Sequence, residues 1–196
     1  MDTRQSAPDR ASGYIRTVLN WIVRIGQAAA WLIMPILLLV LASVVLSAAK
    51  IGTIARWETD IFLFGSKLTL SSLGDLQWHL FGIMLMLTMA GALVSDAHVR
   101  VDFLRQHMSE RTKDIVDLIG HLALLLPFCA IVILHSFDFA TRSFSMGEGS
   151  DYDGLYDRFL LKSFMPIGFG LLFIAGTGLS IIKLRALFSR KDAADD

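Results

Sequence analysis

The chain has 196 residues, of which 54% are hydrophobic and 18% are charged, and its formal net charge at pH 7 is zero. Soluble domains are roughly 45–50% apolar and about a quarter charged, so this composition is typical of a membrane protein. The balanced charge excludes the basic surface of a nucleic-acid-binding protein. The single cysteine, Cys129, excludes an internal disulfide and a cysteine-based metal site within one chain.

Four stretches contain no Asp, Glu, Lys or Arg, and each has at least 20 residues: Ile25–Ala49, Leu76–Ser95, Leu118–Phe137 and Ser163–Ile182. About 20 helical residues, at a rise of about 1.5 Å each, cross a hydrocarbon core about 30 Å thick. We therefore predict an all-α membrane protein. Its single four-helix domain, residues 14–185, is expected to cross the membrane at about residues 28–49, 76–95, 115–137 and 163–182.

The N-terminal segment has two parts. Residues 1–13 are polar, which predicts a disordered tail. The apolar run that follows the N-terminal segment is longer than the ~7–15-residue core of a signal peptide, so we do not expect cleavage. Residues 14–25 are amphipathic, with Tyr14, Ile15, Val18, Leu19, Ile22 and Ile25 on one face and Arg16, Thr17, Asn20 and Arg24 on the other. This pattern predicts a helix in the headgroup plane; the alternative is an extension of the first transmembrane helix.

The first transmembrane helix contains Pro35, which is expected to kink it. The connection that follows, Lys50–Asp75, includes Trp57 and the run Phe62–Phe64, which are too apolar for a fully solvated loop. We expect this connection to rest on the membrane surface or on a partner. The residues expected to cap the second transmembrane helix are Ser71, Ser72 or Asp75.

The segment Asp96–Arg111 carries most of the charge in the middle of the chain. Apolar and polar residues alternate from His98 to Phe103, which is typical of a strand. An open strand at a bilayer surface leaves backbone groups unpaired. The residues that fall on one helical face are Ala97, Val101, Leu104 and Met108. We therefore predict a turn followed by an interfacial helix.

The second half of the domain begins at Ser109, which is expected to cap the third transmembrane helix, while Pro127 interrupts that helix. The connection Phe137–Lys162 is acidic and rich in glycine, and its spacing does not match a calcium-binding EF-hand, so we interpret it as a solvated loop. Pro166 is expected in the first turn of the fourth helix. Small residues line that helix and favour close helix packing: Gly168, Gly170, Gly176, Gly178 and Ser180.

Basic residues indicate the orientation of the chain. Twelve Lys and Arg residues lie in the N-terminal segment, the middle segment and the C-terminal tail, and six lie in the other two connections. Cytoplasmic loops carry the excess of Lys and Arg, so both termini and the middle segment are predicted to be cytoplasmic. Residues 1–13 and 186–196 would then be cytoplasmic tails.

The residues within the apolar stretches bear on two kinds of chemistry, solute transport and electron transfer. Ionisable residues deep in a membrane helix mark substrate or ion pathways. The four uncharged stretches have almost none, and no Asp, Glu, Lys or Arg, so we do not expect this chain to move a solute by itself. His79 and His135 fall at similar depths near one end of the second and third helices. A four-helix haem electron carrier with these two ligands is therefore the alternative function. Sequence motifs of nucleophilic, metalloprotease or phosphate-binding sites are missing, so we predict no enzymatic activity and no cofactor.

Several motifs occur in order along the chain. They are Leu76-Gln77-Trp78-His79-Leu80-Phe81, Asp96 with His98-Val99-Arg100-Val101-Asp102, Asp117–Gly120, Leu126–Phe128, Glu148-x-Ser150, Gly154-Leu155 and Lys162-Ser163-x-x-Pro166-x-Gly168-Phe169. In these motifs the chain resembles the DctQ-like small permease of tripartite ATP-independent periplasmic (TRAP) transporters, in the subgroup of mannitol/chloroaromatic type. Two positions depart from that pattern: Asp75, where the subgroup has Glu, and Tyr156, where the family continues with Pro.

The resemblance implies a small, non-catalytic scaffold subunit in the bacterial inner membrane. It would serve a sodium-coupled, binding-protein-dependent importer of organic acids or related solutes, and the solute site would lie in other subunits. The implied partners are the large TRAP permease subunit, a periplasmic solute-binding protein and membrane lipids. Candidate interface residues are Trp57, Gln77, Trp78, His79, Asp96, His98, Arg100, Asp102, Glu148, Asp151, Gly168 and Gly170. An accessory subunit of an unrelated membrane complex is the remaining alternative.

Overall fold

The structure is a computed structural model that describes residues 7–97, 108–150, 152 and 154–195. Its helices are α1 (Ala7–Ala30), α2 (Ile33–Ala48), α3 (Leu70–Val94), α5 (Glu110–Ile119), α6 (Leu126–Ser145) and α7 (Phe159–Asp195), with a π-helical turn η1 (Gly120–Leu125) and two strands, β1 (Thr53–Ile61) and β2 (Gly65–Thr69). Within these residues, four helical stretches are long and apolar enough to span a membrane: Ser12–Ala48, Leu70–Val94, Glu110–Ser145 and Phe159–Phe188. The predicted all-α membrane protein with four spans is confirmed.

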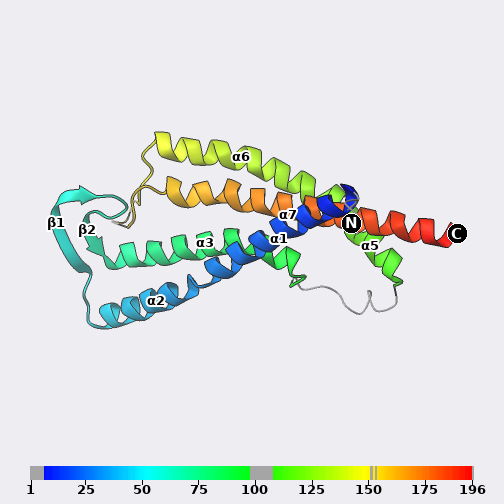
Figure 1. Ribbon diagram of the computed structural model, residues 1–196. Helices are drawn as coiled ribbons and strands as arrows, with labels where there is room; N and C mark the ends of the chain where they lie inside the picture. Colours follow the sequence, from blue (N-terminus) through cyan, green and yellow to red (C-terminus); the bar gives the residue numbers. More distant parts are fainter. Residues whose placement is uncertain (1–6, 98–107, 151, 153, 196) are drawn as a thin grey trace, which may run out of the picture.

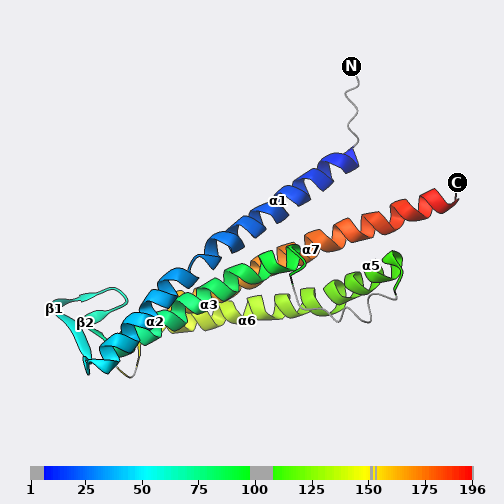
Figure 2. The same ribbon diagram turned by 90° about the horizontal axis from the view of Figure 1, so that it is seen from below.

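Helix α7 is the centre of the bundle. It packs on α6 along one side and on α3 along the other, and α1 crosses both α3 and α7 (Figure 1). Helix α2 packs on α3 and continues the direction of α1 after a break (Figure 2). The strands and the α6–α7 connection lie together at one end, here called the hairpin end, and both termini lie at the opposite end, here called the termini end.

Helix α1 begins at Ala7, earlier than the predicted boundary at residue 14. Its apolar face packs into the bundle, where Leu19 and Ile22 are 5% and 3% exposed. The amphipathic helix is thus present, and α3 and α7 cover part of the face assigned to the headgroup region. Its position relative to the bilayer stays a prediction.

The first span is broken at Trp31 and Leu32, four and three residues before Pro35. A proline has no N–H, and its ring collides with the carbonyl four residues earlier, so it kinks or breaks a helix. Pro35 lies in the first turn of α2, where a missing N–H costs little. The expected kink is therefore a break between two helices.

The connection Lys50–Asp75 was not predicted to contain strands. It forms an antiparallel hairpin in which Thr53 pairs with Thr69 and Arg56 pairs with Lys67. Hydrogen bonds between β1 and β2 satisfy the backbone groups of a segment that leaves the helical bundle. The hairpin is the one extended element among the described residues.

Helix α3 begins at Leu70, six residues before the predicted start of the second span. Its N-cap is Thr69, whose hydroxyl accepts a hydrogen bond from the Ser72 N–H at 3.1 Å. The Ser72 hydroxyl accepts one from the Thr69 N–H at 3.3 Å, which completes a capping box. Ser71, Ser72 and Asp75 therefore lie inside the helix, and the prediction that one of them is the N-cap was wrong.

The third span contains a π-helical turn, η1, between α5 and α6. Ser109 caps α5 by accepting a hydrogen bond from the Thr112 N–H at 3.2 Å, which confirms the predicted cap. Pro127 follows η1 at the start of α6. A proline inside a helix removes one hydrogen bond, and a π-turn is one way in which the backbone accommodates that loss. The predicted interruption at Pro127 takes this form.

Helix α7 begins at Phe159 and its backbone stays helical to Asp195. Pro166 therefore lies inside the helix and not in its first turn, which corrects the sequence prediction. The helix also continues through residues 186–195, which were assigned to a cytoplasmic tail, as the red end of the ribbon shows (Figure 1).

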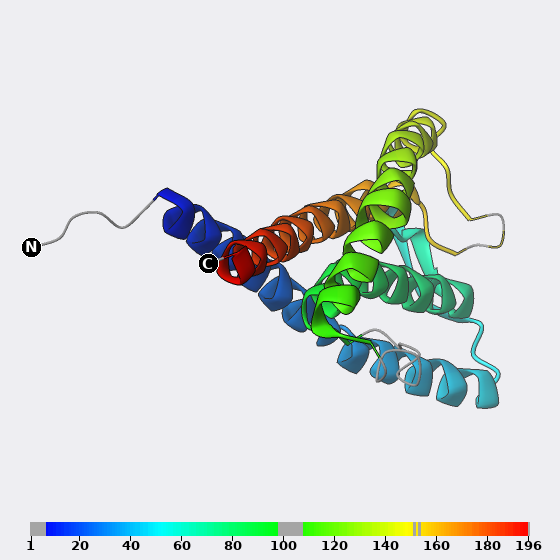
Figure 3. The ribbon, with the colours of Figure 1, turned by 90° about the vertical axis from the view of Figure 1, so that its right-hand side faces the viewer.

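Small side chains occupy the most deeply buried positions of the core between the helices, and larger side chains surround them. Ala90, Cys129 and Ala175 have no exposed surface, and they pack with Leu19 and Ile22. Small residues allow helix backbones to approach closely, which is the main source of packing energy between helices in a bilayer. The helices spread apart around α7 (Figure 3). Many large apolar side chains are exposed on the outside, among them those of Leu38, Leu124 and Leu134.

Candidate functional site

The hairpin end contains a network of polar groups centred on Asp75 of α3. The Asp75 carboxylate accepts a hydrogen bond from the Leu155 N–H at 3.1 Å and from the Arg158 guanidinium at 3.4 Å. Leu155 is fully buried, so its N–H has no access to water. A single carboxylate thus fixes the α6–α7 connection, some 80 residues away in sequence, to the start of α3.

The capping residues of α3 extend this network. Ser72 has no exposed surface, and its hydroxyl donates to the Gly154 carbonyl at 3.5 Å. Gly154 packs so closely against the Asp75 carboxylate that an added Cβ would collide with it. The sequence motif Gly154-Leu155 is therefore a close-packed contact between the connection and α3.

The connection is also tied to α7 and to the hairpin. Glu148 forms an ion pair with Lys162, whose ammonium lies 3.9 Å from the centre of the Phe139 ring. The hydrogen bond from Lys162, with its positive charge, holds the pKa of Glu148 below its usual range. The Tyr156 N–H donates to the Leu63 carbonyl at 2.8 Å, which joins the connection to the hairpin turn.

Gly65 is required at the first position of β2. Its φ of +61° is in the left-handed region, and the ring of Tyr156 occupies the space that a side chain would take. The Trp57 indole N–H donates to the Gly65 carbonyl, so Trp57, a candidate contact residue, is used within the hairpin. The hairpin end is therefore a preformed platform and not a set of independent loops.

The Gln77-Trp78-His79 motif places its three side chains in three environments. The Gln77 amide donates to the Ser43 hydroxyl at 2.6 Å and to the Leu39 carbonyl at 3.1 Å, which links α3 to α2. Trp78 is 72% exposed on the outside of the bundle and makes an edge-to-face contact with Phe81 at 6.1 Å. Of the three, Trp78 is the one available to a partner.

His79 faces inward and is buried. Its Nδ1 donates to the Asp75 carbonyl at 2.7 Å, and its Nε2 is buried with no hydrogen-bond partner among the described residues. His135, the other histidine of the haem alternative, is exposed on α6. Helix α7 separates α3 from α6 (Figure 1), so the two histidines do not face a common site. The residues do not fit a bis-histidine haem.

Gly168 and Gly170 differ in their surroundings. A Cβ on Gly168 would lie 2.5 Å from the Met86 carbonyl oxygen, so this glycine allows α7 to approach the backbone of α3. A Cβ on Gly170 would meet nothing within 4 Å.

The remaining candidate residues lie in or near the connections. Asp96 ends the turn after α3 with a φ of 55°. The candidate residues His98, Arg100, Asp102 and Asp151 lie outside the described residues.

An ion-pair cluster at the termini end was missed from the sequence. The Lys183 ammonium lies 2.7 Å from the Asp117 carboxylate and 3.3 Å from that of Asp114, which joins α7 to α5. The two aspartates lie three residues apart on one helical face, which is the signal that could have found them. Their partner, 66 residues further along the chain, is not evident from the sequence.

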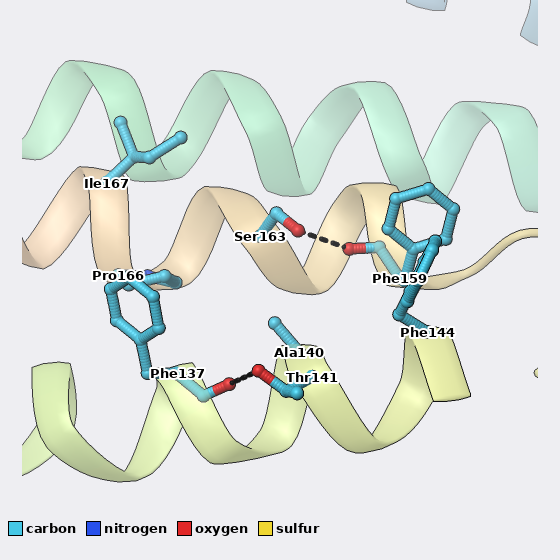
Figure 4. Close-up of a pocket in the computed structure, with 8 residues that line it drawn as sticks. All are labelled: Phe137, Ala140, Thr141, Phe144, Phe159, Ser163, Pro166 and Ile167. Atoms are coloured by element: carbon cyan, nitrogen blue, oxygen red, sulfur yellow. Dashed lines mark hydrogen bonds between the residues drawn. The ribbon is translucent and has the colours of Figure 1, made fainter. Parts of the chain in front are cut away.

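An apolar hollow of about 490 Å³ lies between α6 and α7 towards the hairpin end. Figure 4 shows its lining: Phe137, Ala140, Thr141 and Phe144 from α6, and Phe159, Ser163, Pro166 and Ile167 from α7. The hydroxyls of Thr141 and Ser163 donate to backbone carbonyls of their own helices, each at 2.8 Å. Because this lining offers no ionisable group, the hollow is suited to apolar surface and not to a charged solute.

Comparison with known families matches part of the chain to a family model. Residues 62–185, more than half of the chain, match the model of the family described as tripartite ATP-independent periplasmic transporters, DctQ component. Comparison with curated proteins and with solved structures gives no match.

Proposed function

The chain belongs to the DctQ component family of tripartite ATP-independent periplasmic transporters, and on this basis we propose that it is the small, non-catalytic scaffold subunit of such an importer. The importer is sodium-coupled, depends on a solute-binding protein and carries organic acids or related small solutes. The small subunit packs against the large permease subunit in the bacterial inner membrane. The hairpin end then faces the periplasm and the termini end faces the cytoplasm.

The observation that carries this proposal is the distribution of charge in the bundle. The described ion pairs of Asp75, Glu148 and Lys162 lie at the hairpin end, and those of Lys183 lie at the termini end. A solute or ion pathway requires ionisable side chains or unwound backbone near the bilayer midplane. The uncharged stretches contain no Asp, Glu, Lys or Arg, and at the break in the first span the N–H groups of Trp31 and Leu32 still donate to carbonyls three residues earlier. Transport chemistry is therefore assigned to a partner.

The outside of the bundle supports a packing role. The Trp78–Phe81 pair projects from α3 beside α2, whose side chains are mostly exposed and apolar. Aromatic residues are enriched at the buried centres of protein interfaces. We assign this face to the large permease subunit and the platform at the hairpin end to the solute-binding protein.

The experiment is a pull-down of the tagged full-length chain from its own membrane in mild detergent, with partners identified by mass. We expect a large permease subunit in about stoichiometric amount and no solute binding by the small chain alone. Deleting the chain should abolish uptake. Solute binding by the purified small chain, or recovery of the chain with a different membrane complex, would contradict the proposal.

The partner face is tested by replacing Trp78 with Ala and, as the matched control, Trp31 with Ala. Both tryptophans are exposed to a similar degree, 72% and 71%. The first variant should recover less of the large subunit, while the second should recover an unchanged amount. Equal recovery of the large subunit with both variants would mean that the interface does not include Trp78 of α3.

A further inference from the structure

A second apolar groove lies between α1 and α7 and has a volume of about 340 Å³. Its walls include Val18 and Leu19 from α1 and Phe173, Ile174 and Ile181 from α7. The hydroxyl of Thr177, also in the wall, donates to a backbone carbonyl of its own helix at 2.8 Å. The groove therefore presents almost only hydrocarbon to whatever occupies it.

The length of the groove along α7 is close to the thickness of one leaflet of the hydrocarbon core. Phe173 and Ile181 are eight residues apart, which is about 12 Å along a helix, and half of a hydrocarbon core is about 15 Å. Both lie in the last uncharged stretch of the chain, in the part that leads to the termini end. With the predicted orientation, the groove runs through the inner leaflet.

The volume of the groove indicates its occupant. A helix about 10–12 Å wide would occupy on the order of 1,000 Å³ over the same length of about 12 Å, several times the groove volume of about 340 Å³. One hydrocarbon chain fits. Gly178 keeps the groove narrow and deep, because a Cβ there would lie 3.2 Å from Leu19 and 3.3 Å from Ile15.

A positive charge at one end of the groove can bind the headgroup of a lipid whose acyl chain lies in the groove. Arg185 is exposed, makes one further interaction within the chain and lies four residues after Ile181, so it follows on the same helical face, one turn nearer the termini end. Tyr14, which is 74% exposed, also lines the groove. An arginine at headgroup depth is suited to a lipid phosphate.

We propose that this groove binds one acyl chain of an anionic phospholipid of the inner leaflet, and that Arg185 binds its phosphate. The inference rests on membrane insertion and orientation and not on the identity of the large subunit. The lipid fills the gap between α1 and α7 and so fixes the angle at which α1 leaves the bundle.

The test uses the full-length chain in vesicles of phosphatidylcholine with a fraction of phosphatidylglycerol that carries a photoactivatable group on its acyl chain. After illumination, labelled peptides are mapped by mass. We expect labelling concentrated on the groove residues of α1 and α7. Even labelling of these helices and of the exposed face of α2 would mean a general lipid annulus and would overturn the proposal.

Two variants fill the groove from opposite walls, Ile174→Trp and Val18→Trp, and Leu37→Trp on α2 is the control. Ile174 and Leu37 are 48% and 51% exposed, so both variants add a ring to similarly exposed positions. The groove variants should lower groove labelling at least fivefold, and the control should leave it unchanged. Recovery as a single peak in gel filtration shows that each variant is folded. Unchanged labelling in both groove variants would refute the site.

The headgroup part is tested separately with Arg185→Gln. The ratio of groove labelling by phosphatidylglycerol to that by the matching phosphatidylcholine probe should be well above one in the unaltered chain. It should fall to about one in this variant. Arg16→Gln, an exposed arginine on the opposite face of α1, should leave the ratio unchanged. A ratio that does not respond to Arg185, or groove residues crosslinked to the large subunit in the complex, would overturn the proposal.

Discussion

Replacing Asp75 with Ala is the sharpest perturbation of the platform at the hairpin end. The change removes the acceptor of the Leu155 N–H, which is fully buried, and leaves Arg158 without this carboxylate. A buried donor without a partner costs about 1–3 kcal/mol, and a partly exposed ion pair at 3.4 Å adds about 0–1 kcal/mol. We therefore expect the connection to open more easily by about 1–4 kcal/mol.

The assay is amide hydrogen exchange of residues 148–158 in the purified chain, because local opening is read directly from exchange rates. A loss of about 1–4 kcal/mol corresponds to exchange that is about fivefold to several hundredfold faster, at about 1.4 kcal/mol per factor of ten. Asp75→Asn keeps an oxygen acceptor for Leu155 and should show a smaller increase. Asp60→Ala, an exposed acid of the hairpin, should show almost none.

Two results would refute this reasoning. If Asp75→Ala exchanges as slowly as the unaltered chain, the carboxylate does not hold the connection. If Asp75→Asn exchanges as fast as Asp75→Ala, the charge and not the hydrogen bond to Leu155 is decisive, and the ion pair with Arg158 would carry the energy.

Three further predictions follow from other contacts. The pKa of Glu148 is lowered in the folded chain, so its ion pair with Lys162 stabilises the connection at pH values above the usual glutamate pKa. This stabilisation should be lost as the pH falls through the lowered pKa. Hydrogen exchange of the connection measured against pH should show the loss, and the Glu148→Gln variant should show no such pH dependence. Gly168→Ala should cost about 1–3 kcal/mol in thermal unfolding because its Cβ meets the α3 backbone, whereas Gly170→Ala should be neutral; equal effects would exclude a close helix crossing. Lys183→Met should cost about 1–3 kcal/mol, since it leaves two aspartates of α5 partly buried without their cation; an unchanged midpoint would contradict this.

Local sequence was sufficient for the spans and for some of their ends. The length of each uncharged stretch can be compared directly with the thickness of a bilayer, so four spans could be predicted without any knowledge of packing. Ser109 was predicted as a cap because its partner, the Thr112 N–H, is three residues away. Pro127 was predicted to interrupt its helix, although not to follow a π-turn. The His98–Asp102 motif has no structural account, since these residues lie outside the described part.

Long-range pairing explains what the sequence missed. The apolar residues of the Lys50–Asp75 connection show no clear period of two, so the hairpin was not evident. Ser72 and Thr69 both have a hydroxyl that can act as an N-cap. Thr69 is the N-cap because strand β2 ends there and α3 begins at the next residue. Asp75 has the chemistry of a cap, yet its partners are residues of the α6–α7 connection.

The sequence by itself determined the class of the protein, the number of its spans and its family resemblance, because hydrophobic length and short motifs are local properties. The tertiary structure alone decided that α7 is central, that the two histidines face different surroundings and that the hairpin end is one connected platform. These features depend on contacts between residues distant in sequence. Such contacts form only when apolar helices pack through their small residues, and neither composition nor spacing specifies which faces will meet.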